Sequence, residues 1–228
     1  MKEPERWKKA HAEREHKTLH IKAAVAGKNC RYLLIATLVY GIWTISYKLA
    51  ITWGGYYYVV VKGLPADQWS RILLIGALFI LVGAICSGIF MDKLGRRATL
   101  LIGCTGSIIG FLGLGLTTSG AGFYFSPIFF WMVFLFMPIV FGYIMIFFSE
   151  IFPTEIRGTC VGITTTAARV SYVVGPLLAA LLLFIFLDTN MDGFWIAGGL
   201  FMIIPLFSLL LKPYETKGKT LEEIQEKR

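Results

Sequence analysis

The sequence predicts an all-α integral membrane protein with six transmembrane helices, and three observations lead to this prediction. Hydrophobic residues make up 56% of the 228 residues and charged residues only 16%. The mean hydropathy is +0.68, which water-soluble domains rarely reach. A helix needs about 20 apolar residues to cross roughly 30 Å of hydrocarbon. The length therefore allows about six such helices with their connections, and a soluble protein is excluded.

Six apolar stretches, separated by polar turns, are expected to form these helices. The first, 32–61, would be about 45 Å long, so it must tilt, extend beyond the membrane or break. Gly54 and Gly55 are its expected weak point, because a glycine costs about 1 kcal/mol inside a helix. The other predicted spans are 71–91, 98–117, 123–149, 158–187 and 194–211.

Glycine and proline predict where these helices pack closely or bend. In the third span, glycines recur every three or four residues and give one smooth face against which a neighbouring helix can pack. In the fifth span, Pro176 follows Gly175 and removes a backbone donor, so the helix should bend there. The glycines of the smooth face are Gly103, Gly106, Gly110 and Gly113.

The positions of the basic residues predict the topology. Eighteen of the 22 Lys and Arg lie in the N-terminal stretch, the C-terminal tail and the loops 92–97 and 150–157. Positive charge accumulates on the cytoplasmic side, so both termini are expected in the cytoplasm and the protein in the plasma membrane as a multi-pass protein. We expect a cytoplasmic linker at 1–30, six spans within 31–211 and a cytoplasmic tail at 212–228. Because the charges lie between apolar stretches, no nucleic-acid partner is expected.

No cofactor, metal or disulfide is predicted. The four cysteines are far apart, lie in or beside apolar segments and have no zinc-ligand spacing, so we interpret them as small core or lipid-facing residues. The three histidines all fall in the polar N-terminal stretch, and none is placed to bind haem within the membrane. An intramembrane hydrolase is disfavoured too, because neither a nucleophile with a base nor paired aspartates lie within spans.

Three motifs occur in a fixed order along the chain. The loop after the second span reads G-I-F-M-D-K-L-G-R-R from Gly88, the link after the fourth reads S-E-I-F-P-T-E-I-R-G from Ser149, and the tail contains E-T-K-G-K-T-L-E-E from Glu215. Together with E-P-E-R-W at Glu3, they resemble the C-terminal half of a major facilitator superfamily transporter of the sugar-porter and metabolite:proton symporter lineages. The resemblance runs from the first residues to the tail.

This resemblance implies a fold and a function. The fold would be a six-helix half built from two inverted three-helix repeats, with substrate bound near the bilayer midplane. The function would be transmembrane transport of a small organic solute by alternating access, without enzymatic activity. The expected partners are the solute, the lipid bilayer and either an N-terminal half-transporter or a second copy. No acid lies within a span, so proton symport cannot be assigned to a residue of this chain.

The resemblance also implies a cytoplasmic latch. In such transporters, the acid and arginines of the loop after the second span pair with charged residues at neighbouring helix ends while the outside is open. An ordinary interfacial anchor is the alternative interpretation. The residues that match this latch are Gly88, Asp92, Gly95, Arg96, Arg97, Glu150 and Arg157.

Two basic residues lie inside predicted spans. Arg169 lies 12 residues after Arg157, about 18 Å along the helix and near the bilayer midplane, where a charge usually faces a water-filled cavity. Lys48 lies in the outer part of the first span. We expect both to contact substrate, together with Tyr143 and Thr166.

The substrate class is expected to be an organic anion. The glutamine pair and the tryptophan that sugar porters use are missing, whereas the arginine at 169 resembles carboxylate symporters and can pair with a carboxylate. Three alternatives stay open: half of a sugar transporter, a truncated or split-gene fragment that is inactive without an N-terminal half, and a six-span channel.

Overall fold

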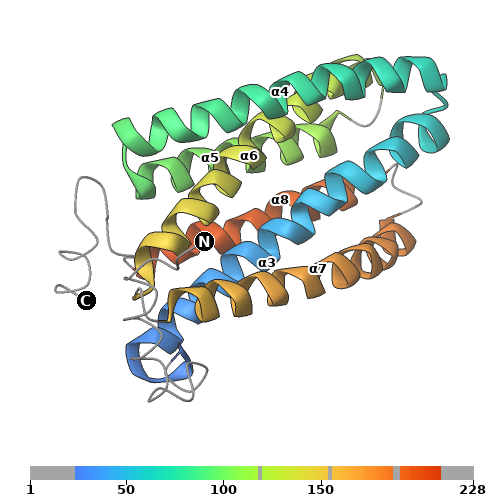
Figure 1. Ribbon diagram of the computed structural model, residues 1–228. Coiled ribbons are helices and arrows are strands. Elements are labelled where there is room, and N and C mark those ends of the chain that lie inside the picture. Colours follow the sequence, from blue (N-terminus) through green and yellow to red (C-terminus); the bar gives the residue numbers. More distant parts are fainter. Residues whose placement is uncertain (1–23, 118–119, 154–155, 187–190, 212–228) are drawn as a thin grey trace, which may run out of the picture.

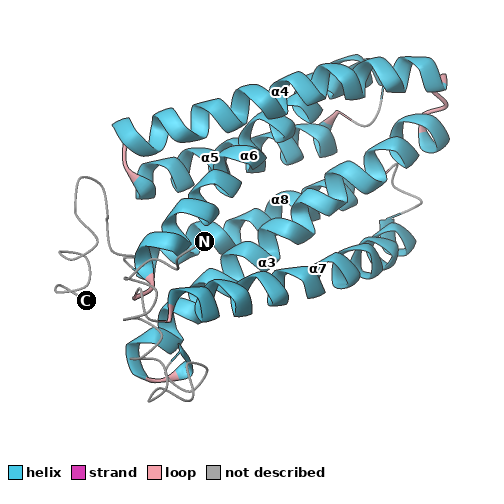
Figure 2. Cartoon of the chain, in the orientation of Figure 1, coloured by secondary structure: helices cyan, strands magenta, loops and turns pink. Residues whose placement is uncertain are grey.

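The computed structural model describes residues 24–117, 120–153, 156–186 and 191–211, and these residues form helices joined by short connections (Figures 1 and 2). Six α-helices are present in the described parts. They are α3 (Gly27–Gly55), α4 (Ala66–Lys93), α5 (Arg96–Leu116), α6 (Ser126–Ile151), α7 (Arg157–Phe186) and α8 (Asp192–Phe207).

The predicted spans agree with these helices to within a few residues at most ends. Among the described residues, five helical stretches are long and apolar enough to cross a membrane. The sixth, α8, has only 16 residues and is followed by a short 3-10 helix, η4 (Ser208–Leu211). The expectation of six full spans is therefore confirmed for five, and the last predicted span is divided between an α-helix and a 3-10 turn. A further 3-10 helix, η2 (Gly120–Phe125), precedes α6.

The first span changes its helical geometry at its expected weak point. Immediately after Gly54 and Gly55, the chain continues as a π-helix, η1 (Tyr56–Val61). Its wider turn is visible in the backbone hydrogen bond of 3.0 Å from the Lys62 amide to the Tyr57 carbonyl. A π-helix is costly and occurs mostly where tertiary packing requires it. Here the packing is aromatic, because Tyr57 and Tyr58 are fully buried.

The helices pack in a pattern that repeats. Helix α3 packs against α7 and α8, helix α6 packs against α4 and α5, and α5 also packs against α8. In Figure 1, α3 and α7 run side by side in the lower part of the view and α4 lies above them with α5 and α6. These contacts are related by a simple correspondence, in which α3 corresponds to α6, α4 to α7 and α5 to α8. Exchanging each helix for its counterpart gives the same set of contacts. Two three-helix repeats would produce this pattern, and their inverted relation stays a prediction.

The smooth glycine face of α5 packs as predicted. A β-carbon at Gly103 would contact Val140 of α6, and one at Gly110 would contact Val133 of α6. A β-carbon at Gly106 or Gly113 would collide with a phenylalanine ring of α6. Absence of a side chain thus lets α5 and α6 approach closely, which is how small residues drive helix association in a membrane.

Candidate functional site: a charge cluster at one end of the bundle and a cationic face between two helices

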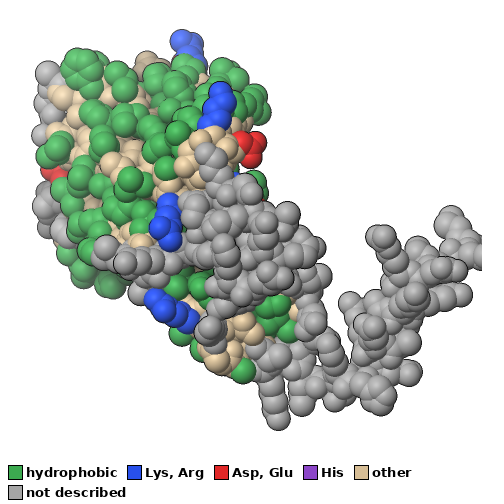
Figure 3. All heavy atoms as spheres, turned by 90° about the vertical axis from the view of Figure 1, so that its left-hand side faces the viewer, with side chains coloured by type: hydrophobic (Ala, Val, Ile, Leu, Met, Phe, Trp, Pro, Cys, Tyr) green, Lys and Arg blue, Asp and Glu red, His purple; other side chains and the backbone are tan. Residues whose placement is uncertain are grey.

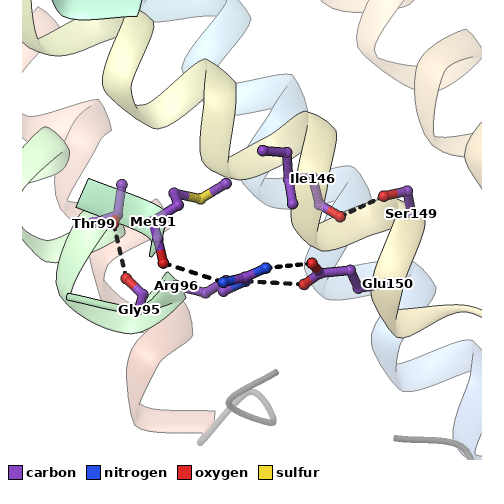
Figure 4. Close-up of polar contacts among 7 residues, drawn as sticks. All are labelled: Met91, Gly95, Arg96, Thr99, Ile146, Ser149 and Glu150. Carbon is purple, nitrogen blue, oxygen red and sulfur yellow. Dashed lines mark hydrogen bonds and ion pairs between the residues drawn. The ribbon is translucent and has the colours of Figure 1, made fainter. Parts of the chain in front are cut away.

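An ion pair joins the α4–α5 turn to the end of α6 (Figure 4). Arg96 donates from Nε to Glu150 Oε2 at 3.0 Å and from Nη2 to Oε1 at 2.5 Å. Its Nη1 also donates to the Met91 carbonyl at 3.1 Å. The two side chains are only 13% and 18% exposed, so the contact is partly shielded from solvent. A fork of two parallel charge-assisted bonds fixes the orientation of both helix ends.

Glycine is required at the turn that presents Arg96. Gly95 has φ = 90°, a backbone conformation that other residues rarely adopt, and it is buried. Its carbonyl accepts a hydrogen bond of 2.8 Å from Thr99 Oγ1. Gly88 differs, since it is exposed and a β-carbon there would meet no described atom within 4 Å. No contact among the described residues therefore explains why position 88 is a glycine.

The other predicted latch residues lie around this pair. Asp92 and Arg97 are exposed, and the carboxylate that pairs with Arg96 is that of Glu150. Arg157 is partly buried, and its Nε donates to the Phe152 carbonyl at 3.2 Å. The structure thus brings Arg96 and Glu150 into direct contact, and it leaves Asp92 at the surface of the same end of the bundle.

In the middle of the bundle, Tyr172 connects the two predicted intramembrane cations. The Lys48 ammonium lies 4.3 Å from the centroid of the Tyr172 ring, and the Arg169 guanidinium carbon lies 5.1 Å from it. Both distances are within the range of cation–π attraction. Lys48 comes from α3, whereas Arg169 and Tyr172 are one turn apart on α7. Arg169 is exposed and Lys48 partly exposed, so this cationic face is open to whatever covers α7.

Two glycines bring α3 and α7 close enough for this contact. A β-carbon at Gly41 would lie 3.1 Å from Ser171 Oγ, and one at Gly175 would lie 3.7 Å from the Ile45 Cα and 3.6 Å from the Lys48 Cβ. Helix α7 continues through Gly175 and Pro176 as one element from Arg157 to Phe186. The glycine beside the proline therefore serves as a packing contact for Lys48.

Aromatic rings lie beside this face where α3 meets α6, and Trp43 is buried among them. Trp43 stacks on Tyr47 and on Phe141 of α6, in both cases with ring centroids 5.0 Å apart. The Trp43 indole N–H donates to the Met137 carbonyl at 3.0 Å, which fixes the ring against α6. Tyr40 is close enough to Arg169 to interact with it electrostatically. The result is a wall with two cations and several aromatic side chains, contributed by three helices.

The two remaining predicted contact residues have different positions. Thr166 is exposed and lies one turn before Arg169 on α7, so it shares the cationic face. Tyr143 is only 1% exposed and stacks on Phe147 at 4.9 Å, within the core. The structure therefore brings Lys48 and Arg169 together at Tyr172, places Thr166 one turn before Arg169, and places Tyr143 in the protein interior.

Sequence reasoning missed Tyr172 and the aromatic stack. A signal for Tyr172 was present, since it lies three residues after Arg169 and so shares its helix face. The contacts of Trp43 with Phe141 depend on how α3 and α6 are rotated about their axes, which a local pattern does not reveal. As to metals, no group of three or more His, Cys, Asp or Glu side chains is placed to hold an ion in the described parts. The three histidines lie outside the described residues.

The chain is similar to several curated transporters. It is 30% identical over 163 residues to the "Sugar transporter ERD6-like 8" of Arabidopsis thaliana, covering 64% of this chain and 32% of that protein. It is 32% identical over 141 residues to the "D-xylose-proton symporter" of Escherichia coli, covering 59% and 28%. It is 27% identical over 188 residues to a "Putative metabolite transport protein" of Haemophilus influenzae, covering 73% and 37%.

Solved structures share the fold. The proton:xylose symporter XylE bound to 6-bromo-6-deoxy-D-glucose superposes with a TM-score of 0.69 at 20% identity, and a double tryptophan mutant of XylE with 0.65 at 22%. Each comparison covers 96% of this chain and 48% of the symporter. The chain thus spans about half the length of these structures, and the part matched in the curated relatives is about a third of theirs.

These similarities bear on the expected substrate and family. Two of the named relatives are sugar transporters, so the preference for an organic anion is not supported and the sugar alternative fits better. Residues 1–176, well over half of the chain, match the family described as the Major Facilitator Superfamily. With its apolar helices and the shared fold, the chain belongs to the Major Facilitator Superfamily of membrane transporters.

Proposed function

We propose that this chain forms the C-terminal half of a solute pathway and that the cationic face of α3 and α7 binds a sugar during alternating access. The observation that carries the proposal is the exposed position of Arg169, 12 residues into a membrane-spanning helix. An arginine at this depth costs about 2.5–3.5 kcal/mol when it meets lipid, so such residues face water or a partner. An aqueous cavity at the α3–α7 face removes this cost.

The chemistry of the face suits a polyhydroxylated solute. Arg169 offers five N–H donors and Lys48 three, and sugar hydroxyl oxygens can accept them. The rings of Tyr47 and Tyr172 offer apolar faces beside these donors, as in solute sites that combine an apolar lining with a few polar groups. A carboxylate could accept the same donors, and the named sugar-transporter relatives favour the sugar. Thr166, which shares this face, is retained as a predicted contact residue, whereas Tyr143 is buried in the core and is not part of the proposed site.

Binding of solutes to the purified chain in lipid nanodiscs tests this proposal. We expect D-xylose or D-glucose to change the tryptophan fluorescence, Trp43→Phe to remove that change, and Arg169→Gln to weaken binding about tenfold, which corresponds to about 1.4 kcal/mol. Arg71→Gln is the control, because Arg71 is exposed and lies at one end of α4. A response to benzoate alone would favour an organic anion as the substrate, and no response to any solute would contradict the proposed site.

A second half is expected to cover the exposed faces of α4 and α7. The most apolar windows of both helices are only 22% buried within the chain, whereas those of α3, α5 and α6 are at least half buried. Alternating access needs two halves that rock about the site. We therefore propose an N-terminal half-transporter or a second copy as partner, as an alternative to a fragment that is inactive without one.

Cross-linking distinguishes these possibilities. A cysteine in place of Leu177, 67% exposed on α7, should form a cross-link to the partner within the membrane. A cysteine in place of Leu101 on α5, 48% exposed, should not. The mass of the product identifies a second copy or a different chain. Equal cross-linking from both positions would contradict a partner specific for α7.

We further propose that Arg96 and Glu150 are the centre of a latch on the cytoplasmic side, surrounded by the other matching residues. The partial burial of the pair supports this role, because a partly buried pair that exists in only one state can bias a two-state equilibrium. The basic residues near the helix ends support the orientation. Five of them lie at this end of the bundle: Arg31, Lys93, Arg96, Arg97 and Arg157.

A further inference from the structure

A groove runs between α3 and α8 at the end of the bundle where α3 begins. Its volume is 740 Å³, and its lining is almost entirely apolar. Leu34 and Leu38, 63% and 50% exposed, lie one turn apart on α3, and Ile204 and Phe207 face the groove from α8. The first turns of this membrane-spanning helix therefore contribute apolar side chains to a groove on the surface of the protein.

Among the residues that the structure describes, one charged side chain lines this groove. Arg31 is exposed and lies one turn before Leu34, at the start of the membrane-spanning stretch Asn29–Val61. At the start of a span, a side chain is at the depth of the lipid headgroups. A guanidinium binds phosphate through paired, charge-assisted hydrogen bonds. Figure 3 views this end of the molecule, where Lys and Arg side chains stand among apolar ones.

A neighbouring groove provides a contrast. The groove between α5 and α8 has a volume of 290 Å³ and is lined by apolar residues alone. No charged or polar side chain in its described lining could recognise a headgroup. The α3–α8 groove combines a larger apolar channel with a cation at its mouth, so it complements a ligand that has both an acyl chain and a negative charge.

We propose that the α3–α8 groove is a binding site for one anionic glycerophospholipid. The phosphate lies on Arg31, and an acyl chain lies along Leu34, Leu38 and Phe207. With the start of α3 on the cytoplasmic side, as proposed above, the groove opens to the leaflet that carries most anionic lipid. A zwitterionic lipid would fill the same groove, but its headgroup has no net negative charge and would be attracted less strongly to the Arg31 guanidinium.

The reactivity of Cys30 reports occupancy without any substitution. Cys30 lines the groove and is partly exposed, whereas Cys86 is also partly exposed but lies on α4, outside the groove. We expect phosphatidylglycerol added to the detergent-purified chain to slow maleimide labelling of Cys30 at least fivefold and to leave Cys86 unchanged. Phosphatidylcholine with the same acyl chains should protect much less, and inorganic phosphate not at all. Equal protection by both lipids, or none, would overturn the proposal.

A charge variant tests the headgroup contact separately. By native mass spectrometry, Arg31→Gln should lower the retention of phosphatidylglycerol at least fivefold relative to phosphatidylcholine. Lys93→Gln is the matched control, because Lys93 is exposed at the same end of the bundle and does not line the groove. Equal losses in the two variants would show a general surface attraction and would overturn the assignment to this groove.

Discussion

The end of the bundle that carries the α4–α5 turn is joined by an ion pair, whereas the opposite end is joined by aromatic rings. At the first end, the fork between Arg96 and Glu150 connects two helix termini. At the other, Tyr58 packs on Trp69 with ring centroids 5.3 Å apart and on Phe130 at 5.7 Å. Tyr57 adds an edge contact to Trp195 at 5.2 Å.

This difference shows which end can change its contacts at low cost. The charged groups of an ion pair can exchange their partner for water, because the separated ions remain hydrated. Buried aromatic rings lose packing when they separate, and their rigid shapes fit one arrangement. We therefore expect the aromatic end to determine the stability of the fold and the charged end to bias its conformational equilibrium.

The largest effect is expected at the aromatic end. Phe130 is fully buried between Tyr58, Trp69 and Phe134. Phe130→Ala should lower the free energy of unfolding by about 3–5 kcal/mol, because it leaves a cavity in packed surroundings. Denaturation of the purified chain in detergent measures this change. Phe184→Ala, at a position 83% exposed, is the matched control, and a loss there as large as at Phe130 would contradict the comparison.

A smaller effect is expected when the ion pair is broken. Glu150→Gln should lower the free energy of unfolding by about 1.5–3 kcal/mol, the range of hydrogen bonds to charged groups. A double-mutant cycle with Arg96→Gln isolates the interaction. If the two losses add to within about 0.5 kcal/mol, the residues are not coupled and the latch lacks its centre.

Asp92→Asn tests the role of the latch in transport separately from the stability of the fold. Because Asp92 is exposed, we expect the stability to change by no more than about 0.5 kcal/mol. Uptake by proteoliposomes that contain the assembled transporter should nevertheless fall, and the balance of inward and outward states should shift. Unchanged transport kinetics in this variant would count against a latch that includes Asp92.

The smallest effect concerns Lys62, which follows the π-helix. Burial lowers the pKa of Lys62 from its ordinary value, and nearby Asp192 partly opposes this shift. The unfolded chain therefore binds more protons than the folded one between the lowered and the ordinary pKa, so stability should rise slightly as pH increases through this interval. Thermal unfolding of the parent chain and of Lys62→Gln at several pH values measures this rise in stability. The variant should lack this rise, and a decrease in the parent chain would contradict the assigned sign.

The sequence predicted those features that depend on local pattern. Helix ends follow from where polar turns interrupt apolar stretches, and the π-helix follows Gly54 and Gly55 because paired glycines weaken a helix. The pairing of Arg96 with the end of α6 was implied by the family resemblance that two of the motifs carry. These features require no knowledge of how the helices are rotated.

Features that depend on helix rotation were missed. The sequence suggested Tyr143 as a contact residue, but α6 directs it into the core. Tyr172 shares the helix face of Arg169, but its contact with Lys48 depends on how α3 and α7 pack side by side. In a membrane helix nearly every position is apolar, so the hydrophobic period that reveals the buried face of a soluble helix is weak.

Between the two ends lies the cationic face, and the water accessibility of position 169 tests the central claim most directly. The measurement is labelling of Arg169→Cys by a membrane-impermeant thiol reagent, in a chain whose Cys30 and Cys86 are replaced by Ser. Cys104 and Cys160 are fully buried and serve as internal negative controls. We predict rapid labelling that is slowed by D-xylose or D-glucose, since this face borders an aqueous solute pathway. Labelling as slow as that of Cys104 would show that position 169 faces no water, and it would contradict the proposed pathway.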